Sequence, residues 1–156
     1  MFGFVVKGVL VCAALTAGCI GALSQNSAAG RDRPVAKLTD HSGRSVTIRY
    51  QDVITQLALQ PGAAINPPGK DDLERALQTV VDQRILGTPA LEEAAAFGWQ
   101  PVEKDIEQKL REVVSFYPSS NEFAARIKLA GFHSLQDEKF RDVLRRRLFI
   151  DWYLDV

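Results

Sequence analysis

Apolar residues recur every three or four positions along much of this chain, and this spacing is typical of helices with one buried face. The clearest stripe predicts a helix over residues 71–86, with Leu73, Leu77, Val80, Val81 and Ile85 as its apolar members. The same spacing predicts helices over 51–59, 90–97, 102–116 and 123–130, and a last helix that starts at 134–137 and runs to the end. The pattern therefore favours a mainly α-helical domain.

Proline and glycine mark the places where these helices end. Residues 60–69 contain three prolines and two glycines, so they separate the first helix from the second. Gly87, Thr88 and Pro89 interrupt the longest stripe, where Thr88 is suited to cap a new helix and Pro89 to occupy its first position. We expect a kink or a short break there. Residues 119–122 form a capping-box pattern before the next helix.

A different pattern precedes the helices. Val46, Ile48 and Tyr50 alternate with other residues, and 40–43 form a glycine-containing turn between this run and an earlier one over 35–39. Two such runs joined by a short turn predict a β-hairpin. Because an isolated hairpin is marginally stable in water, we expect it to pack on the helices. The predicted fold class is mainly α, with a small N-terminal β-hairpin packed on a bundle of about five helices.

Residues 1–29 have the layout of an export signal. Lys7 supplies a positive charge near the start, and residues 8–23 form an uncharged, mainly apolar stretch. A membrane span usually needs about 20 apolar residues, so this stretch is short for one. The folded part is therefore expected outside the cytoplasm, in the periplasm or anchored to a membrane and facing the periplasm.

Three fates of this signal remain open. Cys19 follows Leu15–Gly18 in a pattern that resembles a lipobox, which makes Cys19 a candidate for lipidation and for a membrane tether. Small residues up to Ala29 suit ordinary cleavage, and retention as an uncleaved anchor is the third possibility. In each case a short tether over 30–33 leads into a single domain over 34–156.

The composition of this domain limits its chemistry. Both cysteines, Cys12 and Cys19, lie in the signal, so the rest of the chain has no disulfide, cysteine-based metal site or cysteine nucleophile. All 19 acidic side chains lie beyond residue 30, as do all the basic ones except Lys7, so the exported part is close to neutral. Without a positive field, nucleic acid is not an expected partner.

The order of these elements resembles the N-terminal domain of SurA-type periplasmic chaperones, which belong to a parvulin-linked foldase family. The segments that carry the resemblance are Leu77–Ile85, Glu92–Gly98, Val102–Ile106, Phe116–Phe123 and Leu144–Ile150. Each segment alone is an amphipathic pattern, and the order and spacing of all five give the resemblance its specificity. One departure is the interruption at 87–89, because the corresponding helix of the family is unbroken.

The resemblance implies an extracytoplasmic chaperone-like module that binds unfolded or exported polypeptides. Family members usually continue into a parvulin domain with prolyl isomerase activity, and no such domain is present in this sequence, so we expect no isomerase activity. The alternatives are a lipoprotein adaptor or dimerisation module that binds one folded partner, or a truncated peptidyl-prolyl cis-trans isomerase.

No group of residues has the pattern of a catalytic, metal or cofactor site. His41 and His133 are isolated from cysteines and from spaced carboxylates, so they are expected to be solvated loop residues. The adjacent carboxylates at 71–72 and 92–93 lie near predicted helix starts, where the helix dipole explains them. We therefore expect no enzyme activity and no cofactor.

The last helix carries a cluster of positive charge, formed by Arg141, Arg145, Arg146 and Arg147. Carboxylates four positions away favour ion pairs along the helix surface; the expected pairs are Asp137–Arg141, Asp142–Arg146 and Arg147–Asp151. Binding of anionic lipid or of peptide carboxylates is a second hypothesis for the cluster.

The end of the last helix is apolar on nearly all sides, and such a helix is normally covered. It is expected either to be buried against the hairpin and the first helix or to form a surface for client chains or a second subunit in a homodimer. The aromatic residues that we expect to line client-binding grooves are Phe116, Phe123, Phe132, Phe149, Trp152 and Tyr153.

Overall fold

The structure is a computed structural model that describes residues 28–39, 43–65 and 67–156. It divides into two compact units, one that ends at Tyr50 and one that spans Gln51–Val156. The export signal with its lipidation candidate Cys19 lies outside the described residues, and so does His41.

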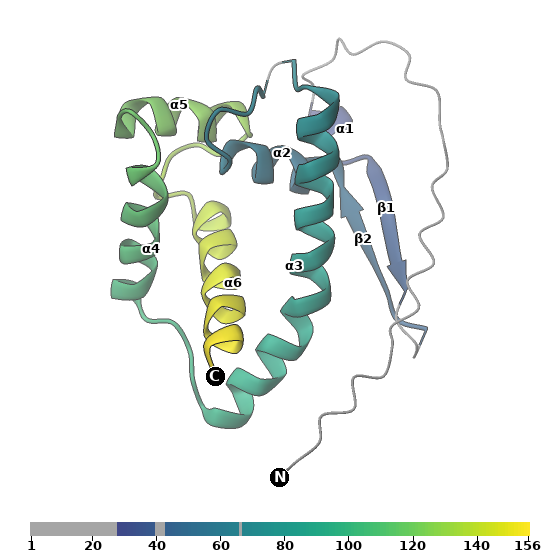
Figure 1. The fold of residues 1–156 in the computed structure, drawn as a ribbon, viewed down its shortest axis with the longest axis vertical. Coiled ribbons are helices and arrows are strands. Elements are labelled where there is room, and N and C mark those ends of the chain that lie inside the picture. The colour runs from purple at the N-terminus through teal and green to yellow at the C-terminus, as the bar shows by residue number, and fades with distance from the viewer. Residues whose placement is uncertain (1–27, 40–42, 66) are drawn as a thin grey trace. The chain divides into compact units, whose positions relative to one another are not determined.

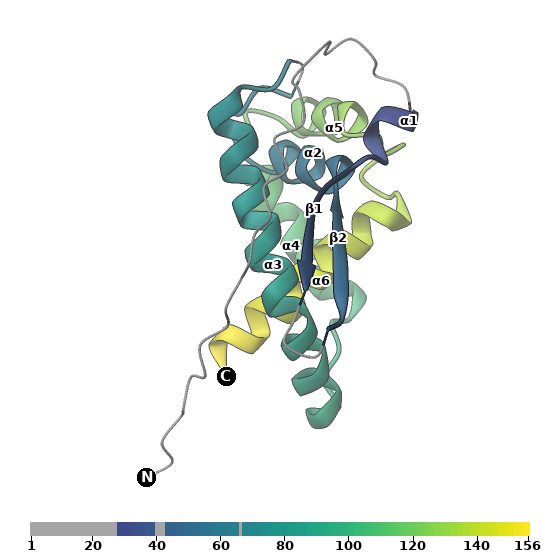
Figure 2. The same cartoon turned by 90° about the vertical axis from the view of Figure 1, so that its right-hand side faces the viewer.

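The first unit contains a short helix and the hairpin. Helix α1 spans Ala28–Arg31, and strands β1 (Pro34–Thr39) and β2 (Ser45–Arg49) pair antiparallel, as Figure 2 shows. Gly43 precedes β2 with φ 82°, a left-handed conformation that glycine adopts without strain. The predicted hairpin is confirmed, and the start of the predicted tether at 30–33 belongs to α1.

The two strands of the hairpin keep one register from Ala36 to Thr39. Leu38 lies opposite Val46, and an irregularity follows Pro34 at the start of β1. Beyond the last pair, the backbone N–H of Tyr50 donates to the carbonyl of Arg33 at 2.9 Å. The guanidinium of Arg33 lies 4.4 Å from the centre of the Tyr50 ring, which is a cation–π contact. These contacts join the start of β1 to the point where the next helix begins.

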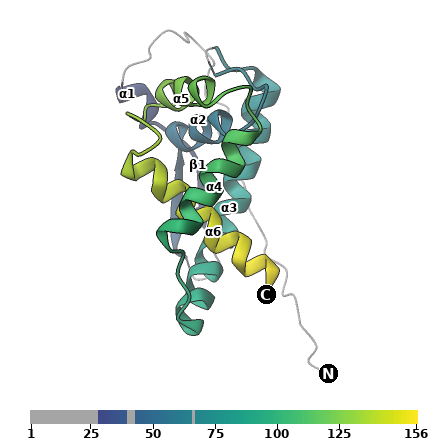
Figure 3. The same cartoon turned by 90° about the vertical axis from the view of Figure 1, so that its left-hand side faces the viewer.

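Five helices account for most of the second unit. They are α2 (Tyr50–Ala58), α3 (Lys70–Phe97), α4 (Glu103–Ser115), α5 (Ser120–Leu129) and α6 (Glu138–Asp155). Helix α6 packs on both α3 and α4 and lies between them in Figure 1, whereas α2 and α5 lie together at one end, as Figures 1 and 3 show. The prediction of a mainly helical chain with a small N-terminal hairpin and about five helices is confirmed.

The core of the second unit combines aliphatic and aromatic side chains. Its largest fully buried members are Leu57, Ile106, Phe123, Ile127, Phe140 and Leu144. The ring centres of Phe123 and Phe140 lie 6.1 Å apart. Burial of each such side chain stabilises a fold by roughly 1.5–3 kcal/mol. The apolar stripes therefore supply the main force that holds α2, α4, α5 and α6 together.

The longest helix differs from the prediction. Residues 70–97 form one continuous helix, so of the two outcomes expected at 87–89 the break, with a helix start at Thr88 and Pro89, is wrong, and the kink is found (Figure 1). Pro89 removes one backbone hydrogen bond, which costs about 3 kcal/mol in a helix interior, and Figure 1 shows that α3 bends in its second half. The helix continues because α3 packs on α6 and because Ala90 and Ala94, beyond the proline, are fully buried.

Side chains cap two of the later helices. The Ser119 hydroxyl accepts the backbone N–H of Glu122 at 3.1 Å, as the capping-box pattern predicts. The Asp137 carboxylate accepts the backbone N–H groups of Lys139 at 3.0 Å and His133 at 2.9 Å. Helix α6 therefore begins directly after Asp137, and the loop before it is fixed to the same carboxylate.

Candidate interaction surface

Four aromatic side chains meet where the end of α3 approaches the last turns of α6. The rings of Trp99 and Trp152 are stacked, with centres 5.0 Å apart and an interplanar angle of 8°. Phe149 contacts Trp99 edge-on at 5.4 Å, and Phe97 contacts Trp152 edge-on at 6.0 Å. Both are favourable arrangements of aromatic rings. These four residues are called the aromatic surface below.

The end of α3 places two of the four rings. Gly98 has φ 65°, and its N–H donates to the carbonyl of Ala95 at 3.2 Å. The next N–H, of Trp99, donates to the carbonyl of Ala94 at 2.8 Å, so the chain turns back directly after Phe97. A residue with a side chain at position 98 would be strained by this φ. The glycine therefore fixes where Phe97 and Trp99 point.

Helix α6 supplies the other two rings. Phe149 and Trp152 are three residues apart, so they lie on one face of the helix. Between them, the carboxylate of Asp151 pairs with the Nζ of Lys109 on α4 at 2.9 Å. This ion pair ties the last turns of α6 to α4, so all four rings project from anchored helix ends.

The aromatic surface is partly open to solvent. Phe97 is 66% exposed, whereas Trp99, Phe149 and Trp152 are half-buried. Leu154 follows on the last turn of α6 and is 64% exposed. Exposed apolar side chains that gather in one place mark sites of interaction more often than isolated ones do. This end of the second unit is therefore the candidate interaction surface.

Two of the six aromatic residues predicted to line a binding groove belong to the aromatic surface, namely Phe149 and Trp152. Tyr153 follows them on α6 and is half-buried. Phe116 is 62% exposed, but it follows the last residue of α4. Since α4 starts at Glu103, Phe116 lies about 20 Å along that helix from its start. The predicted residues therefore lie in separate places in the structure and do not line one groove.

The remaining two predicted residues pack inside the second unit. Phe123 is fully buried, so its assignment to a client-binding groove is corrected. The reason is that Phe123 and Ile127, four residues apart, form the buried stripe of α5. Phe132 is half-buried, and its ring centre lies 5.4 Å from that of Phe140.

The sequence prediction missed Phe97 and Trp99. In the sequence these residues flank Gly98, and that pattern indicates only the end of a helix. Their contact with α6 joins segments that are far apart along the chain, and no local spacing encodes it. The available signal was the occurrence of two large aromatic residues on either side of a helix-ending glycine.

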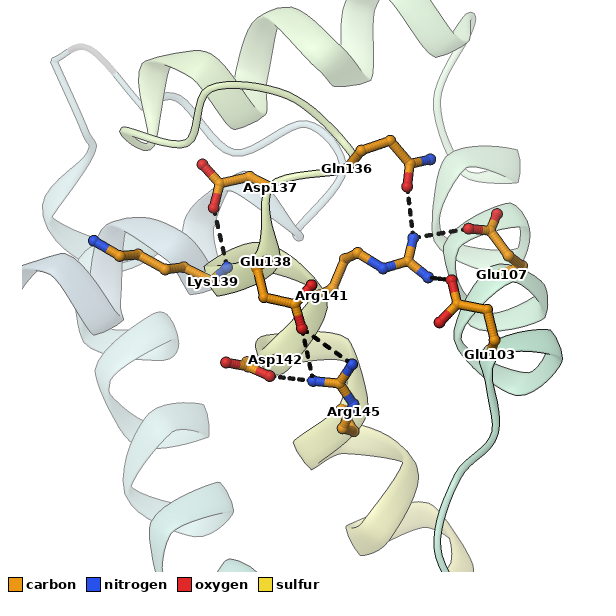
Figure 4. A network of polar contacts seen from close by, with 9 residues as sticks. All are labelled: Glu103, Glu107, Gln136, Asp137, Glu138, Lys139, Arg141, Asp142 and Arg145. Carbon is orange, nitrogen blue, oxygen red and sulfur yellow. Dashed lines mark hydrogen bonds and ion pairs between the residues drawn. The ribbon is translucent and has the colours of Figure 1, made fainter.

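The arginine cluster forms a different set of ion pairs from the one predicted. Arg141, with its side chain only 5% exposed, donates to Glu107 at 2.7 Å and also pairs with Glu103. Figure 4 shows its guanidinium pointing from α6 towards these two residues of α4, and Gln136 accepts a further hydrogen bond at 2.8 Å. The hydrogen bond to Glu107 raises the pKa of Arg141 above its usual value. The expected Asp137–Arg141 pair is absent because Asp137 caps α6.

The other arginines of the cluster differ in environment. Arg145 pairs with Asp142 and Glu138, both on α6, so the expected Asp142–Arg146 pair is also wrong. Arg146 is exposed. Arg147 donates to the side-chain oxygen of Gln56 on α2, while Asp151, its expected partner, pairs with Lys109. Much of this positive charge is thus used in contacts within the unit.

Arg147 differs from the other arginines of the cluster in one of its donor atoms. Its Nε is buried and has no hydrogen-bond partner in the part of the chain that the structure describes. Desolvation by burial lowers the pKa of Arg147 from its usual value. The contact with Gln56 and the buried Nε therefore argue against a ligand site at Arg147.

Within residues 28–39, 43–65 and 67–156, no group of three or more His, Cys, Asp or Glu side chains is arranged to hold a metal ion. No helix in the same ranges is both long and apolar enough to cross a bilayer. Comparison of the chain with family models, with curated proteins and with solved structures gave no match. The resemblance to SurA-type chaperones therefore stays a prediction from sequence.

Proposed function

We propose that this chain is an extracytoplasmic, chaperone-like module that holds apolar segments of unfolded or exported polypeptides on the aromatic surface. The observation that carries the proposal is the group of four rings joined by three ring contacts at the ends of α3 and α6, with Phe97 66% exposed. Aromatic side chains of this kind supply large contact area and dominate the energetics of many interfaces.

The size of the surface favours weak and reversible binding. Burial of one large apolar side chain contributes roughly 1.5–3 kcal/mol, and the aromatic surface offers only part of each ring. Association of two molecules costs at least about 4 kcal/mol in lost translational and rotational freedom. Even full burial of four such rings would leave at most about 8 kcal/mol after this cost, so the dissociation constant is expected to be micromolar at best and weaker for partly buried rings. Such affinities suit a protein that captures and releases many clients.

The sequence of residues 1–29 supports the proposed location. A positive start followed by an uncharged apolar stretch is the layout of an export signal, and exported chains are unfolded when they emerge from a membrane. Cys19 would add a membrane tether if it is lipidated. The intact mass of the mature protein, collected from both the soluble and the membrane fractions, distinguishes lipidated Cys19 from cleavage after Ala29.

The proposal is tested by the aggregation of a chemically unfolded client protein, followed by light scattering with and without the chain. The wild-type chain should suppress scattering when it is present in molar excess over the client, because its expected affinity is weak. Phe97→Ser should weaken the suppression, and it should leave the fold intact because the side chain is mostly exposed. Phe116→Ser is the matched control, since Phe116 is 62% exposed at the far end of α4. No suppression by the wild-type chain, or equal loss in both variants, argues against the proposal.

A second candidate is a homodimer through the end of α6, one of the roles considered from the sequence. It is favoured by Leu154, which is 64% exposed on the last turn of α6. Light scattering coupled to size-exclusion chromatography over a range of concentrations separates the two functions. A dimer that persists on dilution and leaves Phe97 protected would favour the adaptor or dimerisation module.

A further inference from the structure

The two segments that build the aromatic surface carry negative charge only. Residues 90–102 and 148–156 contain four carboxylates, Glu92, Glu93, Asp151 and Asp155, and neither segment contains a lysine or an arginine. Arg145 and Arg146 lie one turn before Phe149 on α6, and Arg145 already pairs with Asp142 and Glu138. Phe97 and Trp152, by contrast, have acidic and no basic side chains within one turn of their own helices, although the exported part of the chain is nearly neutral.

The helix register places two of these carboxylates beside the rings. Glu93 is four residues before Phe97 on α3, and Asp155 is three residues after Trp152 on α6, so each shares a helix face with a ring. Both are exposed, and neither forms an ion pair within the described ranges. Asp151 is the exception, since Lys109 already neutralises it.

Two features of the aromatic surface thus attract the same kind of group. Unpaired carboxylates attract cations, and this attraction is strongest at low ionic strength. The faces of aromatic rings also attract ammonium and guanidinium groups. Lysine and arginine satisfy both, and their aliphatic stems add apolar contact.

We propose that the preferred occupant of the aromatic surface is an extended polypeptide segment in which apolar or aromatic side chains are flanked by lysine or arginine. This inference rests on the proposed function and narrows its class of clients. The same charge pattern disfavours an anionic membrane surface, because lipid phosphates would be repelled by Glu93 and Asp155. The occupant is thus a cationic apolar peptide.

The test measures the affinity of the full chain for three peptides that share one apolar core and differ in their flanks. The flanks carry lysine, glutamine or glutamate, and binding is followed by fluorescence anisotropy of a dye on the peptide. We expect the lysine peptide to bind most tightly, about tenfold more tightly than the glutamate peptide at low salt, since exposed charge contacts are individually weak. The difference should shrink in 1 M salt, where the Debye length is about 3 Å.

Variants assign the effect to the proposed carboxylates. The double substitution Glu93→Gln with Asp155→Asn should abolish the preference for lysine flanks and leave binding of the glutamine peptide unchanged. Asp71→Asn is the matched control, because Asp71 is exposed near the opposite end of α3 and forms no ion pair within the described ranges. It should preserve the preference.

The possible outcomes separate this inference from the proposed function. Equal affinity for the three peptides overturns the charge preference and leaves the proposed function standing. Failure to bind any of them overturns both. Binding to vesicles of anionic lipid in preference to the lysine peptide also overturns the inference, because it would identify a membrane as the partner.

Discussion

Two arginines of α6 have opposite balances of charge: Arg141 is buried, and Arg147 is half-buried with a buried Nε. Arg141 pairs with Glu103 and Glu107, whereas Arg147 donates to the neutral side chain of Gln56. The hydrogen bond to Glu107 raises the pKa of Arg141, and burial lowers the pKa of Arg147. Since a buried cation is tolerated only when it is compensated, the two residues should contribute to stability with opposite signs.

Replacement of Arg147 by an apolar side chain should stabilise the protein. Arg147→Met removes a desolvated cation and its unpartnered Nε while keeping most of the buried volume. We expect the free energy of unfolding to rise by about 1–2 kcal/mol, measured by urea denaturation. The adjacent exposed residue provides the control, and Arg146→Met should change stability little. A loss of stability in Arg147→Met would show that its contact with Gln56 outweighs desolvation.

Removal of the charges that face Arg141 should have the opposite effect. The double substitution Glu103→Gln with Glu107→Gln leaves a guanidinium that is 5% exposed without a carboxylate. We expect a loss of about 2–3 kcal/mol, less than for a fully buried pair because both carboxylates are partly exposed. The same double substitution in an Arg141→Met background should cost little. Equal losses in both backgrounds would assign the effect to α4 itself and not to the pairs.

Tyr117 links stability to alkaline pH. It is 8% exposed and its hydroxyl donates to the carbonyl of Ala58 at 2.8 Å. Burial raises the pKa of Tyr117 above 10.0, so its contribution is complete below the unfolded pKa and is lost as pH rises through the folded one. Tyr117→Phe should cost about 1 kcal/mol at neutral pH and flatten the decline in the urea midpoint above about pH 10. An unchanged alkaline decline would assign that decline to other groups.

At the scale of elements, the approach of α3 to α6 depends on small residues. Ala94 is fully buried, whereas its neighbour Ala95 is exposed. Ala94→Leu should overpack this contact and reduce the free energy of unfolding by about 1–3 kcal/mol. It should also disturb the turn at Trp99, because the carbonyl of Ala94 accepts the Trp99 N–H. Near-ultraviolet circular dichroism reports the stacked indoles, and Ala95→Leu is the control that should retain both signal and stability.

The helices could be predicted from sequence where the determining interactions are local. The stripe around Leu77 and the cap at Ser119 encode their structure within a few residues. The continuity of α3 could not be predicted in this way, because the effect of Pro89 depends on tertiary packing of the following turns. Local rules describe Pro89 as a helix start, and burial against another helix overrides them.

For the whole molecule, the contrast between local interactions and tertiary packing also decides which residues of the candidate surface the sequence could predict. The apolar end of α6 predicts an interaction role for Phe149 and Trp152, since their spacing is local. Their partners Phe97 and Trp99 lie much earlier in the chain, at the end of α3 and just after it, and contact them only in the folded unit. The buried position of Phe123, by contrast, has a local signature, because Phe123 and Ile127 are four residues apart and form the buried stripe of α5.

Long-range contacts also determine whether all the helices of the second unit unfold together in one cooperative transition. Arg126 of α5 donates to the carbonyls of Leu57 at 2.9 Å, Gln60 at 3.0 Å and Ala63 at 2.8 Å. One guanidinium therefore donates to carbonyls at the end of α2 and in the proline-rich loop that follows it. The last carbonyls of a helix have no partner within the helix, so they need such a donor. Since Leu57 is also fully buried, α2 is joined to α5 both by its backbone and by the core.

Arg126→Met should therefore destabilise the whole second unit and not α2 alone. The substitution leaves three carbonyls without this donor, and we expect a loss of about 2–4 kcal/mol. Hydrogen exchange of backbone amides should quicken in α2 and in α6 by the same free energy, because the two helices share one core. Arg111→Met, at an exposed position of α4, should leave exchange unchanged. Faster exchange confined to α2 would show instead that this helix opens independently, so that the aromatic surface on α3 and α6 keeps its stability when α2 is released.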